Sequence, residues 1–459
     1  MSDKYRIVMQ YTNGNGVYED KDIIDEGQII CPKTIIDIGL RHQKQIEILQ
    51  SIQDSILKAQ SVYLKEDLDG CPKCGGKLCK KGTTKASFNA IFTDHKVPVQ
   101  RQVCKECKWS SIPSINSLFG THMHPDLLKL QCENASDRPY TKSEIDLNKM
   151  SNSTRKVNNT MTQHSVIETV GQYISEHADL TIPDIIEEAG ELILQVDGGH
   201  IKPLEKHSRS FEAMASVIYS PDSVVPKAKK SKLTLDEFKK ADKNIDRGEI
   251  IQKHCAASAL DDNQKQMKQL TLVAAKKEGL TENTKVTALS DGAKNCWNIV
   301  DSLADECASI TCILDWFHIA MKFQTISLSD THKNLLDSGK WALWHGNVEL
   351  SLDRLTELKK TIRSVKNREK VGKIITYITN NTDKIVDYSD RKLKGLTFTS
   401  NMAECTVESL INQRCKGKQH MRWSREGVHS ILQIRASKAS NDWSMNWLSY
   451  ILNSYQKAA

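Results

Sequence analysis

The chain has 459 residues and a formal net charge of +7, and 39% of its residues are hydrophobic. This length predicts about three domains with buried cores. No apolar run approaches the ~20 residues that span a bilayer, and the start lacks a signal-peptide-like stretch, so we expect neither a membrane protein nor a secreted one.

Residues 1–66 are expected to form a hairpin followed by a helix. Residues 5–11 alternate in polarity, and the glycine-containing turn at 13–16 follows them. Apolar residues then recur at three- and four-residue steps over about 37–65, which predicts a helix. No chemistry is assigned to this part.

The 13 cysteines include two Cys-x-x-Cys pairs, Cys71/Cys74 and Cys104/Cys107, separated by two strand-like stretches. A zinc ion takes four thiolates in a tetrahedron, and each pair supplies two from one tight turn. We therefore predict a zinc ribbon over residues 67–118 with a structural Zn²⁺, because so small a hairpin has too little core to fold alone. The alternative is two unrelated pairs of core cysteines.

Residues 119–180 are predicted to be helical, with helices from 126, over 143–150 and over 153–170. Arg155, Lys156 and many short polar side chains suit phosphate and base-edge contacts, so a helix-turn-helix-like DNA-binding domain is one interpretation. An ordinary polar helical bundle is the other.

Residues 185–325 alternate strand-like and helical stretches, which predicts a mixed α/β sheet with helices on both faces. The expected strands are 192–197, 211–219, 249–257, 285–291 and 309–315, with a Lys-rich insertion at 227–243. Residues 326–395 carry only helical patterns and are predicted to be an all-helical insertion. Residues 396–459 begin with a helix at Ser400 and continue into basic, aromatic sequence.

Two aspartates, Asp197 and Asp291, each follow an apolar strand and precede glycine. Ligands of α/β sheets bind at such strand ends, and carboxylates suit Mg²⁺ or Mn²⁺. A pair of these ions supports phosphodiester chemistry if a third carboxylate joins, and Glu404 or Glu408 is the candidate. The alternative, purely structural roles are ordinary Asp-Gly turns, a helix cap at Asn401 and Glu404, and an ion pair at Glu408.

Four motifs resemble insertion-sequence transposases of the DDE group, in the Mutator-like branch with an RNase H-like core. They are Leu194-Gln-Val-Asp-Gly-Gly, Ala288-Leu-Ser-Asp-Gly-Ala-Lys, Ile313-Leu-Asp-Trp-Phe-His-Ile, and Ser400-Asn-Met-Ala-Glu followed by Asn412-Gln-Arg and Met421-Arg-Trp-Ser. The resemblance covers roughly residues 185–440. It implies an all-α insertion in the core, and the zinc ribbon and helical region resemble the DNA-binding front ends of such enzymes.

The resemblance implies roles for individual residues. Asp197, Asp291 and Glu404 would hold two Mg²⁺ (or Mn²⁺) ions, although Met402-Ala403 departs from the family pattern and leaves Glu408 as the alternative third ligand. His318 would orient the core or lie near the scissile phosphate, or be an ordinary core histidine. Basic groups and a tryptophan would hold a transposon end: Arg414, Lys416, Lys418, Arg422 and Trp423.

The implied activity is cutting of DNA at transposon ends and joining of the 3′-OH ends to target DNA. The implied setting is a homo-oligomer in the bacterial cytoplasm, associated with the nucleoid. Two alternatives stay open, namely an RNase H-like nuclease without strand transfer and a catalytically inactive zinc-ribbon, helix-turn-helix regulator.

Overall fold

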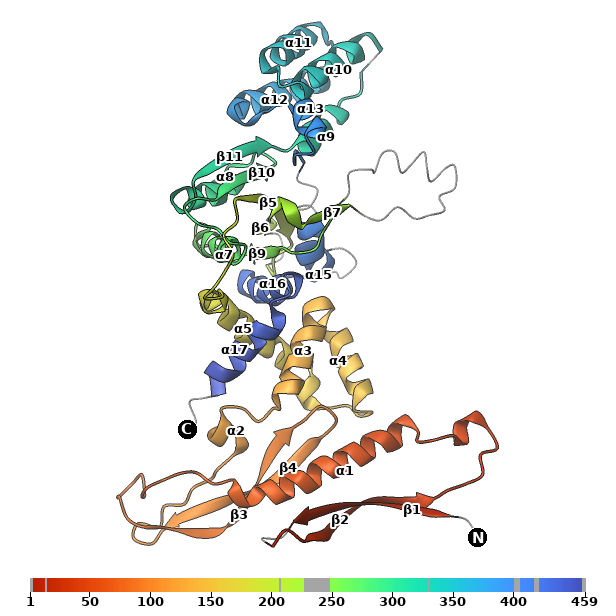
Figure 1. Ribbon diagram of the computed structural model, residues 1–459, viewed down its shortest axis with the longest axis vertical. Coiled ribbons are helices and arrows are strands. Elements are labelled where there is room, and N and C mark those ends of the chain that lie inside the picture. The colour runs from red at the N-terminus through yellow and green to blue at the C-terminus, as the bar shows by residue number, and fades with distance from the viewer. Residues whose placement is uncertain are drawn as a thin grey trace. The chain divides into compact units, whose positions relative to one another are not determined.

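The computed structural model describes residues 3–12, 15–205, 208–226, 248–328, 330–399, 405–416 and 421–455. The chain divides into two compact units (Figure 1). The first comprises Met1–Ile167 with Trp447–Ala459, and the second comprises Glu168–Asn446.

The first unit contains two antiparallel hairpins, a long helix and a group of shorter helices. The strands are β1 (Lys4–Thr12), β2 (Tyr18–Gln28), β3 (Leu78–Asn89) and β4 (Asp94–Cys104). The helices are α1 (His42–Gln60), α2 (Ile115–Phe119), α3 (Pro125–Asp137), α4 (Tyr140–Met150) and the start of α5 (Thr160–Glu176), with 3₁₀ turns at Ile35–Asp37, Ser61–Tyr63 and Lys156–Asn158.

Helix α1 packs against both hairpins of this unit. On one side, the Tyr11 hydroxyl donates to the Ser55 carbonyl at 2.8 Å, and Lys44 pairs with Asp25 on β2. On the other side, Leu57 joins a small core with β3 and β4 that contains Ala86, Val97, Val99 and Ile115. The predicted hairpin and helix near the N-terminus are therefore present.

The third predicted helix of the 119–180 region begins later than expected, at Thr160 instead of residue 153. Asn159 caps it, because its side-chain oxygen accepts the Thr162 N–H at 2.8 Å. Ser153 instead lies in a turn, which places Arg155 and Lys156 ahead of the helix. Their expected position on a helical surface is therefore wrong.

The second unit is built on a five-stranded mixed sheet with the order β11-β10-β5-β6-β9. Strands β5, β6 and β9 are antiparallel neighbours, whereas β10 and β11 run parallel to β5. All five predicted strands are present: β5 (Glu191–Ile201), β6 (Phe211–Tyr219), β9 (His254–Ser258), β10 (Lys285–Ser290) and β11 (Ser309–Leu314). The third begins at His254 because residues 248–250 pair elsewhere, in a ribbon of β7 (Val224–Pro226) and β8 (Gly248–Ile250).

Helices cover both faces of this sheet, as predicted. On one face, Leu192, Leu194 and Val196 of β5 pack with helices α7 (Lys265–Lys277) and α8 (Lys294–Val300). Residues of the other face alternate with these, and a Cβ on Gly199 would lie 3.0 Å from Ile411. The predicted Lys-rich insertion at 227–243 lies outside the described residues.

The stretch predicted to be an all-helical insertion is helical. It contains α10 (Asp330–Trp344), α11 (Val348–Thr361), α12 (Val365–Asn380) and α13 (Tyr388–Leu393), and it follows α9 (Trp316–Gln324). Tyr388 in α13 donates to the Leu314 carbonyl at the end of β11, at 2.7 Å. The insertion therefore lies against the end of the sheet where β10 and β11 finish.

The C-terminal helices follow a segment only partly described. They are the π-helix η8 (Glu408–Asn412), α15 (Gln413–Cys415), α16 (Arg425–Ala439) and α17 (Trp443–Tyr455). Helix α16 is joined to the sheet edge, since Gln433 donates to the Ala257 carbonyl of β9 at 2.8 Å. The helix start predicted at Ser400 lies outside the described residues.

Three 3₁₀ turns and one longer 3₁₀ stretch complete the second unit: Ala178–Thr181, Pro221–Ser223, Thr382–Lys384 and Asp301–Glu306. Among the helices of the described ranges, none has the length and apolarity needed to cross a membrane.

Candidate functional site

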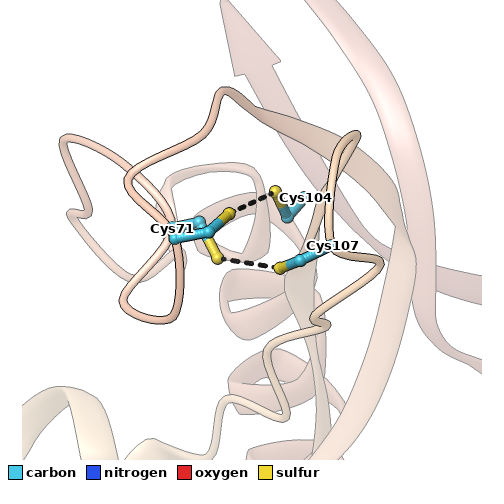
Figure 2. Close-up of side chains that lie close together, drawn as sticks. Cys71, Cys104 and Cys107 are labelled. Carbon is cyan, nitrogen blue, oxygen red and sulfur yellow. Dashed lines mark hydrogen bonds between the residues drawn. The ribbon is translucent and has the colours of Figure 1, made fainter.

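Four cysteines of the first unit converge as the sequence predicts. The Sγ atoms of Cys71 and Cys107 are 3.5 Å apart, as are those of Cys74 and Cys104. All four sulfur atoms lie within 4.8 Å of one another. Figure 2 shows the labelled Cys71, Cys104 and Cys107 with their sulfur atoms turned toward a common centre.

Each Cys-x-x-Cys pair lies on a tight turn at one end of the β3–β4 hairpin. In the first turn the Gly75 N–H donates to the Cys71 carbonyl at 2.8 Å, and in the second the Cys104 N–H donates to the Trp109 carbonyl at 2.8 Å. The residue after each second cysteine has a left-handed backbone, with φ of +72° at Gly75 and +61° at Lys108. The register of Leu78 with Cys104 brings the two turns together.

This cysteine cluster can hold a structural metal such as zinc. A tetrahedron with Zn–S bonds of about 2.3 Å has sulfur–sulfur edges of about 3.8 Å, close to the separations here. The pKa of Cys74 is raised to about 12, where a backbone hydrogen bond from Gly76 lowers it and the thiols of Cys107 and Cys104 raise it. Four neighbouring thiolates repel one another, and a divalent cation removes that penalty.

A second group of candidate residues lies in a row across three neighbouring parallel strands. The row follows the last residues of β10 and β11, and it crosses β5 at the point where its pairing with β10 stops. Val196 of β5 pairs with Ser290 of β10, and Ser290 pairs with Leu314 of β11. The next residue of each strand is an aspartate: Asp197, Asp291 and Asp315. The sheet register thus places three carboxylates in one row at this edge.

Asp197 is only partly exposed, and its pKa is raised. Burial is the largest cause, and the negative charges of Asp291 and Asp315 add to it, while the Gly198 N–H and His318 oppose it. The Gly198 N–H donates to Asp197 Oδ1 at 2.7 Å. Repulsion between the aspartates indicates that a cation at this edge would stabilise them in their charged forms.

Asp291 is held in place by its own turn and by the helical insertion. The Ala293 N–H donates to Asp291 Oδ1 at 2.8 Å, and the Tyr377 hydroxyl of α12 donates to the Asp291 carbonyl at 2.8 Å. Gly292 has a φ of +90°, and a Cβ there would lie 2.8 Å from Leu314. A glycine is therefore required after this aspartate for both conformation and space.

Asp315 is fully buried and caps helix α9, accepting the N–H groups of Phe317 and His318 at 3.2 and 3.1 Å. It also bonds His318 Nδ1 at 2.6 Å. His318 is partly exposed, with 27% of its side chain accessible, and it lies close enough to Asp197 to lower that residue's pKa. This histidine therefore lies beside the aspartate row in a fixed orientation.

The third carboxylate predicted for this site is Glu404, which lies outside the described residues. The alternative, Glu408, is exposed and accepts a hydrogen bond from Asn412 at 2.9 Å. The segment that follows Glu404 does reach the sheet, because Val407 and Ile411 lie within 3.4 Å of a Cβ built on Gly199, two residues after Asp197.

Within the described residues, the cysteines form the only group of three or more possible metal ligands whose atoms lie within 4.8 Å of one another. The aspartates of the sheet edge are neighbours but not so closely gathered. Carboxylate oxygens suit Mg²⁺ or Mn²⁺ by their chemistry.

The predicted DNA-contacting residues lie in different environments. Arg155 is buried and donates to Asp94 at 2.5 Å and to the carbonyls of Ala90 and Ile91, so it holds the β3–β4 turn. Lys156 is exposed.

Among those of the C-terminal region, Arg414 is fully buried with its guanidinium 4.7 Å from the centre of the Trp423 ring, which is itself buried. Lys416 is partly exposed and Arg422 is exposed, and Arg422 donates weakly to the Pro203 carbonyl at 3.3 Å. Lys418 lies outside the described residues.

Sequence reasoning did not assign roles to two residues that this geometry brings to the site, Asp315 and Tyr377. Asp315 had a usable signal, because it follows a short apolar run in the sequence as Asp197 and Asp291 do. Tyr377 had none, since its contact with Asp291 spans 86 residues.

A profile of an uncharacterised protein family (UPF0236) is similar to residues 284–446 of the chain. That span begins at β10 and includes Asp291, Asp315 and His318, but neither Asp197 nor the cysteines. A search of curated proteins finds no match. The match assigns no activity.

Proposed function

We propose that this protein is a DDE-type transposase that binds insertion-sequence ends, cuts the DNA and joins the freed 3′-OH ends to target DNA. The observation that carries the proposal is the row of aspartates formed by Asp197 of β5 and the residues that follow β10 and β11. Three of the four motifs that resemble such enzymes lie at these aspartates. In the fourth, residues 400–404 lie outside the described residues, and Asn412-Gln-Arg lies in the helical segment packed against β5.

The sheet supports an RNase H-like assignment of the core. Three antiparallel strands come first in the sequence, and the two later strands are added in parallel on the other side of β5. This arrangement brings Asp197 of β5 level with the carboxyl ends of β10 and β11, where α/β sheets bind their ligands. The helical run from α10 to α13, which lies between Asp291 and Glu404 in the sequence, agrees with the insertion that the resemblance implies.

In the proposed mechanism, Asp197, Asp291 and Glu404 hold the divalent ions. Two Mg²⁺ ions would supply Lewis-acid stabilisation of the attacking and leaving oxygens of the phosphodiester. Asp291 is kept in place by Ala293 and Tyr377, and His318 is oriented by Asp315 so that its ring stays near Asp197. No covalent link between protein and DNA is needed.

The test is strand cleavage and strand transfer with a labelled transposon end, comparing wild type with Asp291→Asn. We expect both reactions to fall by at least about a hundredfold, with DNA binding retained, because the substitution removes a negative ligand while keeping its size. Asp305→Asn, an exposed aspartate on the neighbouring 3₁₀ stretch, is the matched control and should keep full activity.

Unchanged cleavage by Asp291→Asn would overturn the proposal. Cleavage without any joined product, in wild type, would favour an RNase H-like nuclease. Binding without cleavage would favour a DNA-binding regulator.

A further inference from the structure

The β3–β4 hairpin carries an unusual concentration of positive charge. Residues 71–109 hold nine lysine or arginine side chains and only two acidic ones, a net charge of +7 that equals that of the whole chain. The basic residues are Lys73, Lys77, Lys80, Lys81, Lys85, Lys96, Arg101, Lys105 and Lys108, and the acidic ones are Asp94 and Glu106.

All eight of these lysines are exposed. None of them forms an ion pair with a described residue, although lysines elsewhere in the chain do so, such as Lys44 with Asp25 and Lys277 with Asp442. Asp94 does not neutralise them because it pairs with the buried Arg155. The hairpin therefore presents lysines without ion-pair partners among the described residues, although Glu66, Asp67 and Asp69 precede it along β4.

The fold separates this charge from the core of the hairpin. Ala86, Val97 and Val99 face α1 and are buried. Side chains alternate between the faces of a strand, so Lys85 and Lys96 point to the opposite face. The register of Ser87 with Lys96 and of Lys85 with Pro98 makes these two lysines diagonal neighbours, a separation of about 7–8 Å.

The cysteine turns and a register shift in the ladder extend the lysine-bearing face along the hairpin. The ladder shifts between Lys80 and Thr83, which leaves Lys80 and Lys81 exposed at the bulge. Lys73, Lys105 and Lys108 lie on the two cysteine turns. The cysteine cluster thus fixes basic side chains of both turns at the open end of the hairpin.

We propose that this lysine face of the β3–β4 hairpin, formed by Lys80, Lys81, Lys85, Lys96, Lys105 and Lys108, binds the phosphate backbone of duplex DNA without reading its sequence. The choice of DNA as the polyanion rests on the proposed function. Lysines act as point charges on phosphates, and such contacts position a protein on DNA without specifying bases. The cysteine cluster then stabilises a DNA-binding surface in addition to its own hairpin.

The test measures binding of the full-length, zinc-loaded chain to a short duplex of arbitrary sequence, without Mg²⁺, over a range of salt concentrations. The variant combines Lys80→Gln, Lys81→Gln and Lys85→Gln. Each phosphate contact contributes about 0.9 to the slope of log affinity against log salt, so the slope should fall by up to about 2.7. The charge-matched control combines Lys360→Gln, Lys366→Gln and Lys392→Gln on exposed positions of the helical insertion and should keep the wild-type slope.

Zinc content and thermal unfolding, equal to wild type, show that the variant is folded. If the triple variant fails this check, Lys85→Gln with Lys96→Gln provides a milder version, with an expected fall of up to about 1.8. A slope equal to that of wild type overturns the inference, as does a variant that loses binding to anionic phosphatidylserine vesicles but not to DNA.

The outcome is separable from that of the proposed function. Binding to an arbitrary duplex requires no cleavage, so a reduced slope would stand even if strand transfer were never observed. Strand transfer with an unchanged slope would instead leave the proposed function intact and remove the lysine face.

Discussion

At the scale of single residues, the two cysteine turns each need a left-handed backbone at one position and have different residues there. Gly75 and Lys108 both follow a second cysteine and both have positive φ. Glycine adopts this conformation without cost, whereas a residue with a Cβ loses roughly 1–2 kcal/mol. Lys108 is therefore a site of local strain that the cysteine cluster maintains.

We expect Gly75→Ala to reduce the stability of the first unit by about 1 kcal/mol, and Lys108→Gly to leave it equal or raise it by less than that. A Cβ at Gly75 meets nothing within 4 Å, so the effect is conformational and not steric. Denaturant unfolding of the zinc-loaded chain measures both. A wild-type free energy of unfolding in Gly75→Ala would show that this turn does not need a left-handed residue.

Arg155 illustrates how a basic residue in a polar stretch can be structural. Its guanidinium is buried and donates to the Ala90, Ile91 and Thr93 carbonyls and to Asp94. Its loss would leave buried acceptors without a donor.

We predict that Arg155→Met lowers the free energy of unfolding of the first unit by about 3 kcal/mol. The exposed neighbour variant Lys156→Met should change it by less than about 0.5 kcal/mol. Thermal and denaturant unfolding provide the comparison. If Arg155→Met keeps the wild-type stability but loses DNA affinity, Arg155 contacts DNA and its structural role is wrong.

At the scale of elements, a buried charge cluster joins β9, α7 and the residue before α17. His254 Nδ1 lies 2.6 Å from Glu278 Oε1, and its Nε2 lies 3.4 Å from Asp442, which also pairs with Lys277. Burial lowers the pKa of His254, but the two carboxylates outweigh it and raise the pKa to about 9. The histidine is therefore charged in the folded chain at neutral pH.

This raised pKa predicts a pH dependence of stability. A histidine with a higher pKa in the folded state stabilises fully below its unfolded pKa of about 6.5, and the contribution disappears as pH rises through about 9. The expected loss between these values is about 3 kcal/mol.

In His254→Gln that fall should be absent, so the stability difference between wild type and variant should shrink as pH rises from 6.5 to about 9. The exposed His42→Gln is the matched control and should keep the wild-type pH profile. Unfolding measured from pH 6 to 10 decides the matter, and a wild-type profile that is flat between pH 6.5 and 9 would contradict the cluster's role.

The elements that could be predicted from the sequence are those with a local signal. β5, β10 and β11 each contain a short apolar run followed by Asp, and the cysteine turns carry their glycine and spacing. The start of α5 was missed because Ser153 and Asn159 both have capping side chains, and only the burial of Arg155 favours the second. Long-range contacts such as Tyr377 with Asp291 have no local signal at all.

At the scale of the whole molecule, two compact units hold the two candidate sites separately. The cysteine cluster belongs to the first and the aspartate row to the second. The order of motifs along the chain predicts that the cysteines and the aspartates belong to different domains. The strand order that aligns the aspartates is known only from the register of the sheet.

Metal removal should therefore affect the units differently. A strong chelator should lower the unfolding temperature of the first unit, because the small core of the β3–β4 hairpin does not replace the metal. The transition of the second unit should stay within about 1 °C. Calorimetry before and after chelation, with Zn²⁺ added back as control, measures this. Identical first-unit transitions would mean that the cysteines hold no structural metal.

The central claim is that the aspartates at the sheet edge hold divalent ions. The most direct measurement is anomalous diffraction from crystals of the protein with a transposon-end duplex and Mn²⁺. The account predicts anomalous peaks about 2.1 Å from carboxylate oxygens of Asp197 and Asp291. Mn²⁺ bound elsewhere, with neither aspartate among its ligands, would contradict it.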